Sequence, residues 1–340
     1  MVIDMHCHTA GIGAGGSGCF AAKKLIDSYK FKIYLKAFNV SRKELEEKGD
    51  GLVIQRLAEK LDFSKKVDGA IVLALDGVID SLGNLDSSKT EVYVPNEFLA
   101  RETAKYPKLY FGASVNPHRP DALERLEKWK REGTQLIKWL PSIQNIDPSD
   151  SSIIPFYQKL IELNLPLLTH TGAEKSFTHS RNELCDPARL KLPLELGVTV
   201  IAAHVATTGK SEGERNHERL IAMIPKYPTL YTDISSLTQL NKKFYVKKIL
   251  KHKEIHAKLL YGTDIPLINT ILVSPWYFPI QLSFKQIREV NSHDNMWDRD
   301  VTLKRALGVP DSAFTRAYHL FPMSRKTIMN DDIGIMNDEL

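Results

Sequence analysis

Short apolar runs alternate along the chain with longer stretches in which apolar residues recur every three or four positions. The apolar runs cover residues 2–5, 69–76, 109–116, 134–140, 165–170, 199–204, 230–234 and 258–264. Near-continuous apolar runs of this length predict strands that are buried on both faces. The periodic stretches between them predict amphipathic helices over 96–105, 121–132, 153–163, 187–196, 214–226 and 244–253.

Strands that alternate with helices predict a parallel sheet whose faces are covered by the helices. Residues 23–66 are also helical in pattern, with an apolar stripe that includes Leu57 and Leu61. Eight such strands favour an α/β fold closed into a (β/α)8 TIM barrel, and an open doubly wound sheet is the alternative. We expect residues 1–340 to form a single domain, in which 267–340 supply a closing helix and a C-terminal extension.

The first strand runs into the sequence Asp4-Met5-His6-Cys7-His8. Residues two apart on a strand share one face, so His6 and His8 point the same way, with Cα atoms about 6.6 Å apart. Two imidazoles at that spacing can converge on one divalent ion at about 2.0–2.1 Å from each nitrogen. Taken alone, the pair is equally compatible with two unrelated histidines near a strand end.

Further residues of metal-ligand type stand at or near the ends of later strands. The full candidate set, in chain order, is His6, His8, Lys138, His170, His204 and Asp264. In such barrels the carboxyl ends of the strands meet at one mouth, and the chemistry occurs there. The set therefore predicts a metal site at the mouth. Lys138 could instead reach solvent, His170 and His204 could be core residues, and Asp264 could shape a turn.

These residues resemble the amidohydrolase superfamily over about residues 1–270, and in detail its amidohydrolase 2 branch of TIM-barrel metal-dependent hydrolases. The motifs that carry the resemblance are Asp4-Met5-His6-Cys7-His8, Lys138, His170-Thr171-Gly172, Ala203-His204 and Gly262-Thr263-Asp264-Ile265-Pro266. The resemblance implies that His6, His8, His170 and Asp264 are ligands, with His204 a ligand or a neighbour of the bound water. Binuclear members of the superfamily carry a carboxylated lysine where Lys138 stands, whereas many members of the branch lack a lysine there.

The branch includes zinc or manganese hydrolases, lactonases and non-oxidative decarboxylases. The implied function is hydrolysis of an amide, ester or lactone of a small molecule, and metal-dependent decarboxylation is the alternative. A divalent ion, Zn²⁺ first and Mn²⁺ second, lowers the pKa of a bound water to about 7. Asp264 would orient that water and take its proton, and the ion or His204 would polarise the carbonyl. Carboxylation of Lys138 would allow a second ion.

Three other interpretations compete with this one. The TatD-type nucleases share the paired histidines and the late aspartate, but they usually have an acidic residue where Lys138 stands. The PHP phosphoesterases open with a similar Asp-x-His-x-His-Thr, matched here through Thr9, but they normally need further His and Glu ligands. A catalytically inactive, metal-stabilised binding protein would keep the ligand set without turnover.

The glycine-rich segment 11–18 follows the histidines and contains Gly11, Gly13 and Gly16 in the spacing G-x-G-x-x-G. This spacing after a strand is a dinucleotide-binding signal when an acidic residue follows about 20 positions on. Phe31 and Lys32 stand there instead. We therefore expect a loop over the metal site and no nucleotide binding.

Composition narrows the partners and the setting. The 340 residues include 46 basic and 41 acidic side chains, a net charge of +5, with no basic block interleaved with aromatic residues, so no nucleic-acid partner is expected. Three cysteines without a Cys-x-x-Cys motif indicate a reducing compartment. The chain opens directly into the first strand and has no membrane-span pattern, which favours a cytoplasmic protein. Whether it forms a homo-oligomer is left open.

The long loops after the strands are expected to contact the substrate. Candidate contacts are Glu174, Lys175, Arg181, Trp139 and Trp276. The remaining histidines His118, His179 and His217 fall in predicted loops or helices, and we interpret them as surface residues.

Overall fold

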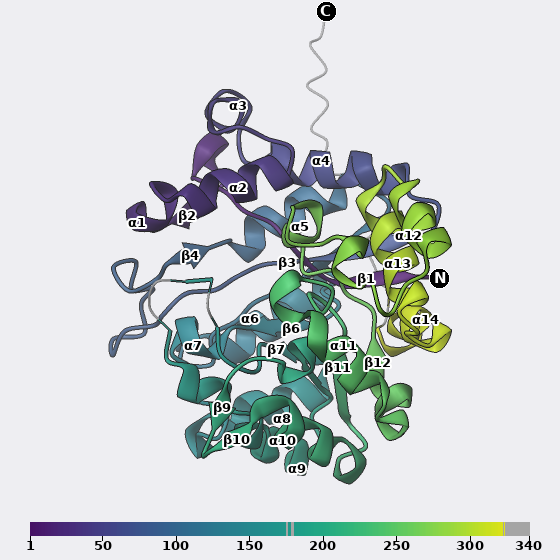
Figure 1. The fold of residues 1–340 in the computed structure, drawn as a ribbon. Helices are drawn as coiled ribbons and strands as arrows, with labels where there is room; N and C mark the ends of the chain where they lie inside the picture. Colours follow the sequence, from purple (N-terminus) through teal and green to yellow (C-terminus); the bar gives the residue numbers. More distant parts are fainter. Residues whose placement is uncertain (175, 178–179, 322, 324–340) are drawn as a thin grey trace, which may run out of the picture.

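The computed structural model describes residues 1–174, 176–177, 180–321 and 323 of the chain, and its centre is a set of parallel strands (Figure 1). A three-stranded sheet has the order β1-β3-β5 and a five-stranded sheet the order β12-β11-β8-β7-β6. These strands are β1 (Ile3–His8), β3 (Gly69–Leu73), β5 (Leu109–Gly112), β6 (Ile137–Trp139), β7 (Leu167–Thr169), β8 (Val200–Ala202), β11 (Leu230–Asp233) and β12 (Leu259–Leu260). Seven of them lie within predicted apolar runs and end before those runs do, because the polar residues that close several runs leave the sheet, whereas β1 extends beyond its predicted run 2–5 to His8.

Single bridges join the two sheets at both edges. Ala113 after β5 pairs in parallel with Ile137 of β6, and Cys7 of β1 pairs in parallel with Ile265 after β12. The Lys138 amide also donates to the Ala113 carbonyl at 2.7 Å. The strands therefore run around a complete TIM barrel, and the predicted fold class is confirmed.

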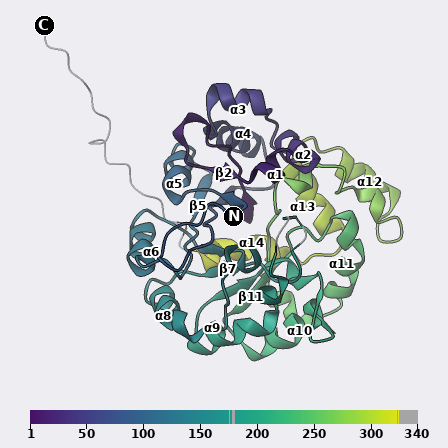
Figure 2. The ribbon, with the colours of Figure 1, turned by 90° about the vertical axis from the view of Figure 1, so that its left-hand side faces the viewer.

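Helices surround the strands as a ring (Figure 2). The helices are α1 (Lys23–Ile26), α2 (Tyr29–Ala37), α3 (Arg42–Lys48), α4 (Gly51–Asp62), α5 (Asn96–Ala104), α6 (Ala122–Arg131), α7 (Pro141–Gln144), α8 (Ile154–Glu162), α9 (Lys191–Leu196), α10 (Asn216–Met223), α11 (Lys243–Leu250), α12 (Phe284–Asn291), α13 (Met296–Ala306) and α14 (Asp311–Leu320). In the part of the chain described here, no helix combines the length and the apolar character needed to cross a bilayer.

The predicted helical region 23–66 is divided into four helices. Ser28 caps the start of α2 by accepting from an amide, and Ser41 and Glu44 form a capping box at the start of α3. Side-chain caps of this kind satisfy the free amides at a helix start and fix where it begins. Two antiparallel pairs were also not predicted, β2 (Phe20–Ala21) with β4 (Val92–Tyr93) and β9 (Lys210–Ser211) with β10 (Glu214–Arg215).

The barrel interior is a separate apolar cluster. Its buried members on the strands and strand ends are Ile3, Met5, Ile71, Leu73, Leu136, Leu168, Ile201, Ala203 and Leu260. Ala317 of α14 and Phe321 just after it belong to the same cluster, and Arg316 donates to the Leu259 carbonyl at the start of β12. Helix α14, which the sequence pattern did not reveal, therefore closes the end of the barrel at which the strands begin.

Candidate metal centre

The predicted site residues come together at the carboxyl ends of the strands. His6 and His8 are on β1, Lys138 is on β6, His170 directly follows β7, His204 comes two residues after β8, and Asp264 comes four residues after β12. A cavity of about 210 Å³ opens above them, lined by His8, Lys138, His170, His204 and Asp264 among others. His6 is completely buried. Strand ends far apart in the sequence thus supply one cluster.

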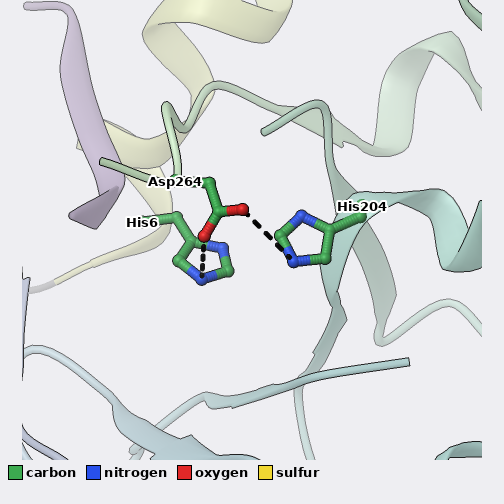
Figure 3. Close-up of side chains that lie close together, drawn as sticks. All are labelled: His6, His204 and Asp264. Carbon is green, nitrogen blue, oxygen red and sulfur yellow. Dashed lines mark ion pairs between the residues drawn. The ribbon is translucent and has the colours of Figure 1, made fainter. Parts of the chain in front are cut away.

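The carboxylate of Asp264 lies between the imidazoles of His6 and His204 (Figure 3). Its Oδ1 is 3.3 Å from Nε2 of His8 and 3.8 Å from Nε2 of His6, while its Oδ2 is 3.9 Å from Nε2 of His204. The Nε2 atoms of His6 and His8 are 3.1 Å apart. Potential ligand atoms of His6, His204 and Asp264 all lie within 4.8 Å of one another, so these nitrogens and oxygens face a common centre.

His170 completes the cluster from β7. Its ring centroid is 5.2 Å from that of His204, and its Nε2 is buried without a hydrogen-bond partner among the described residues. The nearest carboxylate oxygen, Oε2 of Glu174, is 3.6 Å away. A buried polar nitrogen without a hydrogen bond is costly unless a ligand engages it.

Lys138 is 1% exposed and its Nζ lies 3.1 Å from Nε2 of His6. Burial lowers the pKa of its ammonium to about 8, although Asp264 and Asp233 oppose that shift. The sequence left open whether Lys138 faces the metal cluster or reaches solvent, and in the structure it faces the cluster.

The orientation of His6 depends on an irregularity in β1. Met5 belongs to the apolar interior of the barrel and His6 to the site, whereas strict alternation would place neighbouring residues on opposite faces. The pairing of β1 with β3 shifts register between Asp4 and Cys7. A shift of this kind turns a side chain without ending the strand. His6 and His8 therefore converge for two reasons: they are two residues apart on one strand, and the register shift redirects His6.

The backbone is left-handed where two site residues leave their strands. His204, Val205 and Ala206 have φ angles of 58°, 50° and 48°, and Asp264 has φ 63°. Such angles are unfavourable for residues other than glycine and cluster at functional sites. The strained turn is held by the His204 amide, which donates to Oδ1 of Asp233 at 3.1 Å, and by the Val205 amide, which donates to Thr232 at 3.2 Å.

Asp233, the last residue of β11, is the site residue that sequence reasoning missed. Its Oδ2 accepts from Nδ1 of His6 at 3.0 Å, and its Oδ1 accepts from the Ser235 hydroxyl. The Ser235 oxygen in turn lies 2.7 Å from Nδ1 of His204. With both Nδ1 atoms donating, the Nε2 atoms of His6 and His204 keep their lone pairs for an ion, as outer partners of metal-binding histidines typically arrange. The sequence signal that could have identified Asp233 was its position at the end of a predicted strand.

The protonation states suit a cation. Burial, followed by the charge of Lys138, lowers the pKa of His6 to about 4, and burial lowers the pKa of His170 and His204 as well. Burial would raise the pKa of Asp264, but His204, His8 and His6 together hold it well below its usual range. Neutral imidazoles beside an ionised carboxylate are the forms in which these groups bind metals. The residues present therefore fit a divalent ion.

Much of the rest of the cavity lining is apolar. It is formed by Leu25 of α1, by Phe31, Leu35 and the following Phe38 from α2, and by Leu75, Val92, Leu140 and Phe177. The loop after β11 adds Gln239, Asn241 and Lys242. A largely apolar wall with a few converging polar groups is typical of a small-molecule site.

Two interpretations of individual residues were wrong. Trp139 is fully buried and packs on Phe156 with ring centroids 5.3 Å apart. It cannot touch a substrate, because Lys138 beside it on β6 faces the site and strand neighbours alternate. His217 is 1% exposed in α10, against the ring of Tyr245, and so is no surface residue.

The other candidate contacts divide between the cavity and the surface. Glu174 lines the cavity. Trp276 is 57% exposed and contacts Phe284, and Arg181 pairs with Glu183 at 2.9 Å on the surface. Lys175 and His179 lie outside the described residues.

Comparison with known proteins agrees with this arrangement. A family model described as Amidohydrolase matches residues 70–281. A structure of an uncharacterised TIM-barrel protein, Bb4693, from Bordetella bronchiseptica is 13% identical, with a TM-score of 0.58 over 94% of this chain and 98% of that one. A structure of Metarhizium anisopliae IDCase in apo form is also 13% identical, with a TM-score of 0.51 over 94% and 97%. No curated protein matches the chain. At these identities the two structures support the fold alone.

Proposed function

Since the chain belongs to the amidohydrolase family, whose members are metal-dependent enzymes, we propose that it hydrolyses an amide, ester or lactone of a small molecule. The family assignment favours this over a TatD-type nuclease or a PHP-type phosphoesterase. The observation that carries the proposal is the buried cluster of His6, His170 and His204 around an ionised Asp264, in which Nε2 of His170 has no hydrogen-bond partner among the described residues.

We assign His6, His8, His170 and Asp264 as the residues that would hold a divalent ion. The donor pattern at Asp233 leaves Nε2 of His204 unprotonated, which favours His204 as a further ligand. When bound, the ion would lower the pKa of a coordinated water and polarise a carbonyl group. Zn²⁺ is the first expectation for a set dominated by histidine, with Mn²⁺ as the alternative.

The chain's own residues would orient the reaction and move its proton. Asp264 lines the cavity as well as contacting the histidines, so one carboxylate oxygen can accept a proton from water that attacks the substrate. Such general-base catalysis contributes about 10²–10⁴ in rate. The apolar wall from α1 and α2 would exclude other water and hold the body of the substrate.

Decarboxylation is a second candidate, because a buried lysine suits a substrate carboxylate. Lys138 lies within 3.1 Å of His6 and lines the same cavity. The two reactions differ in their products. A hydrolase consumes water and releases an acid with an alcohol or amine, whereas a decarboxylase releases CO₂ from a carboxylic acid.

The test combines metal analysis with a substrate panel of esters, lactones, amides and aromatic acids. We expect turnover by the metal-loaded protein, loss after chelation, and recovery with Zn²⁺ or Mn²⁺. The Asp264→Asn variant should lose about 10²–10⁴ in kcat. Turnover that survives complete metal removal, or a metal-loaded protein inactive on all these classes, would contradict the proposal.

The number of ions depends on Lys138. If the neutral amine of Lys138 attacks CO₂, an N–C bond forms while one C=O π bond of CO₂ opens onto its oxygen, a proton passes from nitrogen to solvent, and the resulting carbamate anion would allow a second ion to be held. Carboxylation would give two ions per chain and a carbamate signal in ¹³C NMR after loading with labelled CO₂, and both would be absent in Lys138→Met. One ion and no such signal would instead support a mononuclear site in which Lys138 remains an amine.

A further inference from the structure

Lys242 is a buried lysine that has no carboxylate partner among the described residues. It ends the short helix Leu240–Lys242 in the loop between β11 and α11, and it is 9% exposed. Its Nζ donates to the hydroxyl of Ser236 at 2.5 Å. Within the described residues no carboxylate lies within ion-pair distance of it. An ammonium group has three hydrogens to donate, so the protein satisfies this one only in part.

Lys304 is a buried lysine of the same chain whose ammonium group is paired, and it serves as a comparison for Lys242. Lys304 is 1% exposed, and its Nζ donates to Oδ2 of Asp300 at 2.7 Å and to the Gly262 carbonyl at 2.8 Å. A buried charge is normally paired in this way, because removing it from water is costly. Lys242 lacks such a pair, although it lies in the wall of the cavity.

A second buried donor stands beside Lys242. Gln239 is 4% exposed and also lines the cavity, and its Nε2 has no hydrogen-bond partner among the described residues. The two residues are joined by the Lys242 amide, which donates to the Gln239 carbonyl at 2.8 Å. One turn of backbone thus presents an ammonium and an amide N–H₂ group, both donors, at the same wall.

From this pair we propose that Gln239 and Lys242 form an anion subsite that binds a carboxylate of the substrate. Leu25, Phe31 and Leu35, which line the same cavity, would contact an apolar body. The enzyme would therefore act on small amphipathic carboxylic acids that carry a reactive carbonyl or carboxyl group. This inference rests on the proposed function for the identity of the site, but its binding step is measurable without turnover.

The experiment measures binding of benzoate and hexanoate to the metal-loaded protein by calorimetry, with benzamide as the neutral counterpart of benzoate. We expect Lys242→Met to weaken carboxylate binding at least tenfold and to leave benzamide binding unchanged. Lys242→Arg should retain most of the affinity, and Gln239→Leu should lose part of it. The control is Lys247→Met, which removes an exposed lysine of the nearby α11 and should change nothing.

Two further measurements separate the subsite from other effects of the same change. Lys242 reaches His204 through Ser236, whose oxygen is 3.2 Å from Nδ1 of His204, so metal content is measured for every variant, and Ser236→Ala should keep carboxylate binding. Thermal unfolding gives a second readout. Removing an unpaired buried charge should raise the midpoint of Lys242→Met, and benzoate should raise the midpoint of the unchanged protein more than that of the variant.

Three results would overturn the proposal. They are equal benzoate affinity of Lys242→Met and the unchanged protein, equal affinity for benzoate and benzamide, and no binding of either carboxylate. The first would mean that the ion alone holds the carboxylate. Failure of the proposed function would look different, as absence of metal or of metal-dependent turnover.

Discussion

The glycine-rich segment 11–18, which follows β1, and the metal cluster, which includes the end of β1, are both polar regions, but their buried polar groups differ in how far the protein supplies hydrogen-bond partners. In the segment, the buried carboxylate of Asp50 accepts from the amides of Ile12 and Gly13 at 3.0 and 2.9 Å and from the Ser17 hydroxyl at 2.5 Å. In the cluster, Nε2 of His170 has no hydrogen-bond partner within the described part of the chain. The polar groups of the first region bind one another, whereas the second region leaves a buried nitrogen that a ligand could engage.

The comparison explains why a glycine pattern alone is weak evidence for phosphate binding. Gly11 is required because a Cβ there would lie 2.4 Å from an oxygen of Asp50, and Gly13 adopts φ 90°, a conformation that favours glycine. The glycines thus permit the chain to fold around Asp50. Amides that already donate to a carboxylate are not available to cradle an anion.

The strongest test removes His170 and compares it with His217. Both are buried histidines whose Nε2 has no hydrogen-bond partner among the residues that the structure describes, but only His170 adjoins the other candidate ligands. We expect His170→Ala to lose its stoichiometric ion on dialysis while remaining folded, because a ligand is missing. His217→Ala should keep the ion. Elemental analysis and circular dichroism measure both properties. Full metal content in His170→Ala would remove it from the ligand set.

Asp50→Ala tests the self-satisfied region. The change leaves two amides and a hydroxyl without their acceptor, and we expect a loss of about 3 kcal/mol in the free energy of unfolding. Urea denaturation measures the loss, and metal content should not change. The control is Asp62→Ala, which removes an exposed partner of Lys108 and should cost about 0–1 kcal/mol. An Asp50→Ala protein that lost its metal but kept its full stability would contradict this prediction, because it would give the Asp50 segment a part in metal binding and none in stability.

Asp233→Asn tests whether the hydrogen bonds of Asp233 prepare the histidines to bind an ion. The amide can no longer accept from both Nδ1 of His6 and the Ser235 hydroxyl, so the lone pair on Nε2 of His6 is no longer secured. Changes to such outer partners lower metal affinity about 10–100-fold, and competition with a chromophoric chelator measures the change. Unaltered affinity would show that the histidines need no help from Asp233.

The smallest expected effect is none at all. NAD and ATP should give no binding heat in calorimetry with the unchanged protein, because Asp50 occupies the donors of the glycine segment. Micromolar binding, abolished by a substitution at Gly13, would contradict the division between the two regions.

Much of the site could be predicted because one rule relates sequence to space. Polar residues that end apolar strands meet at one mouth of a parallel barrel, and His170 and Asp264 were found in this way. Asp233 obeys the same rule, but a single aspartate after a strand is not distinctive without its contacts to His6. Trp139 was misassigned because its place near a strand end was considered without the alternation that turns it outward.

Other features depend on contacts that have no local pattern. Gln239 and Lys242 lie in a loop, and only the folded cavity wall reveals that neither has a full set of partners. Helix α14 contributes Ala313 and Ala317 to the core, and these small residues give little periodic signal. The left-handed turn at His204 is imposed by Asp233 and Thr232 on another strand.

The apolar wall contributed by α1 and α2 has a consequence for how this enzyme could diversify. The wall comes from a stretch between the first two barrel strands, and none of the six candidate ligands belongs to it. Exchanging Leu25, Phe31 or Leu35 would reshape the chamber without disturbing the histidines. The apolar lining and the candidate ligands thus belong to different segments of the chain. Substitutions in one short stretch could therefore change which apolar groups fit the cavity, while the candidate ligands stay the same.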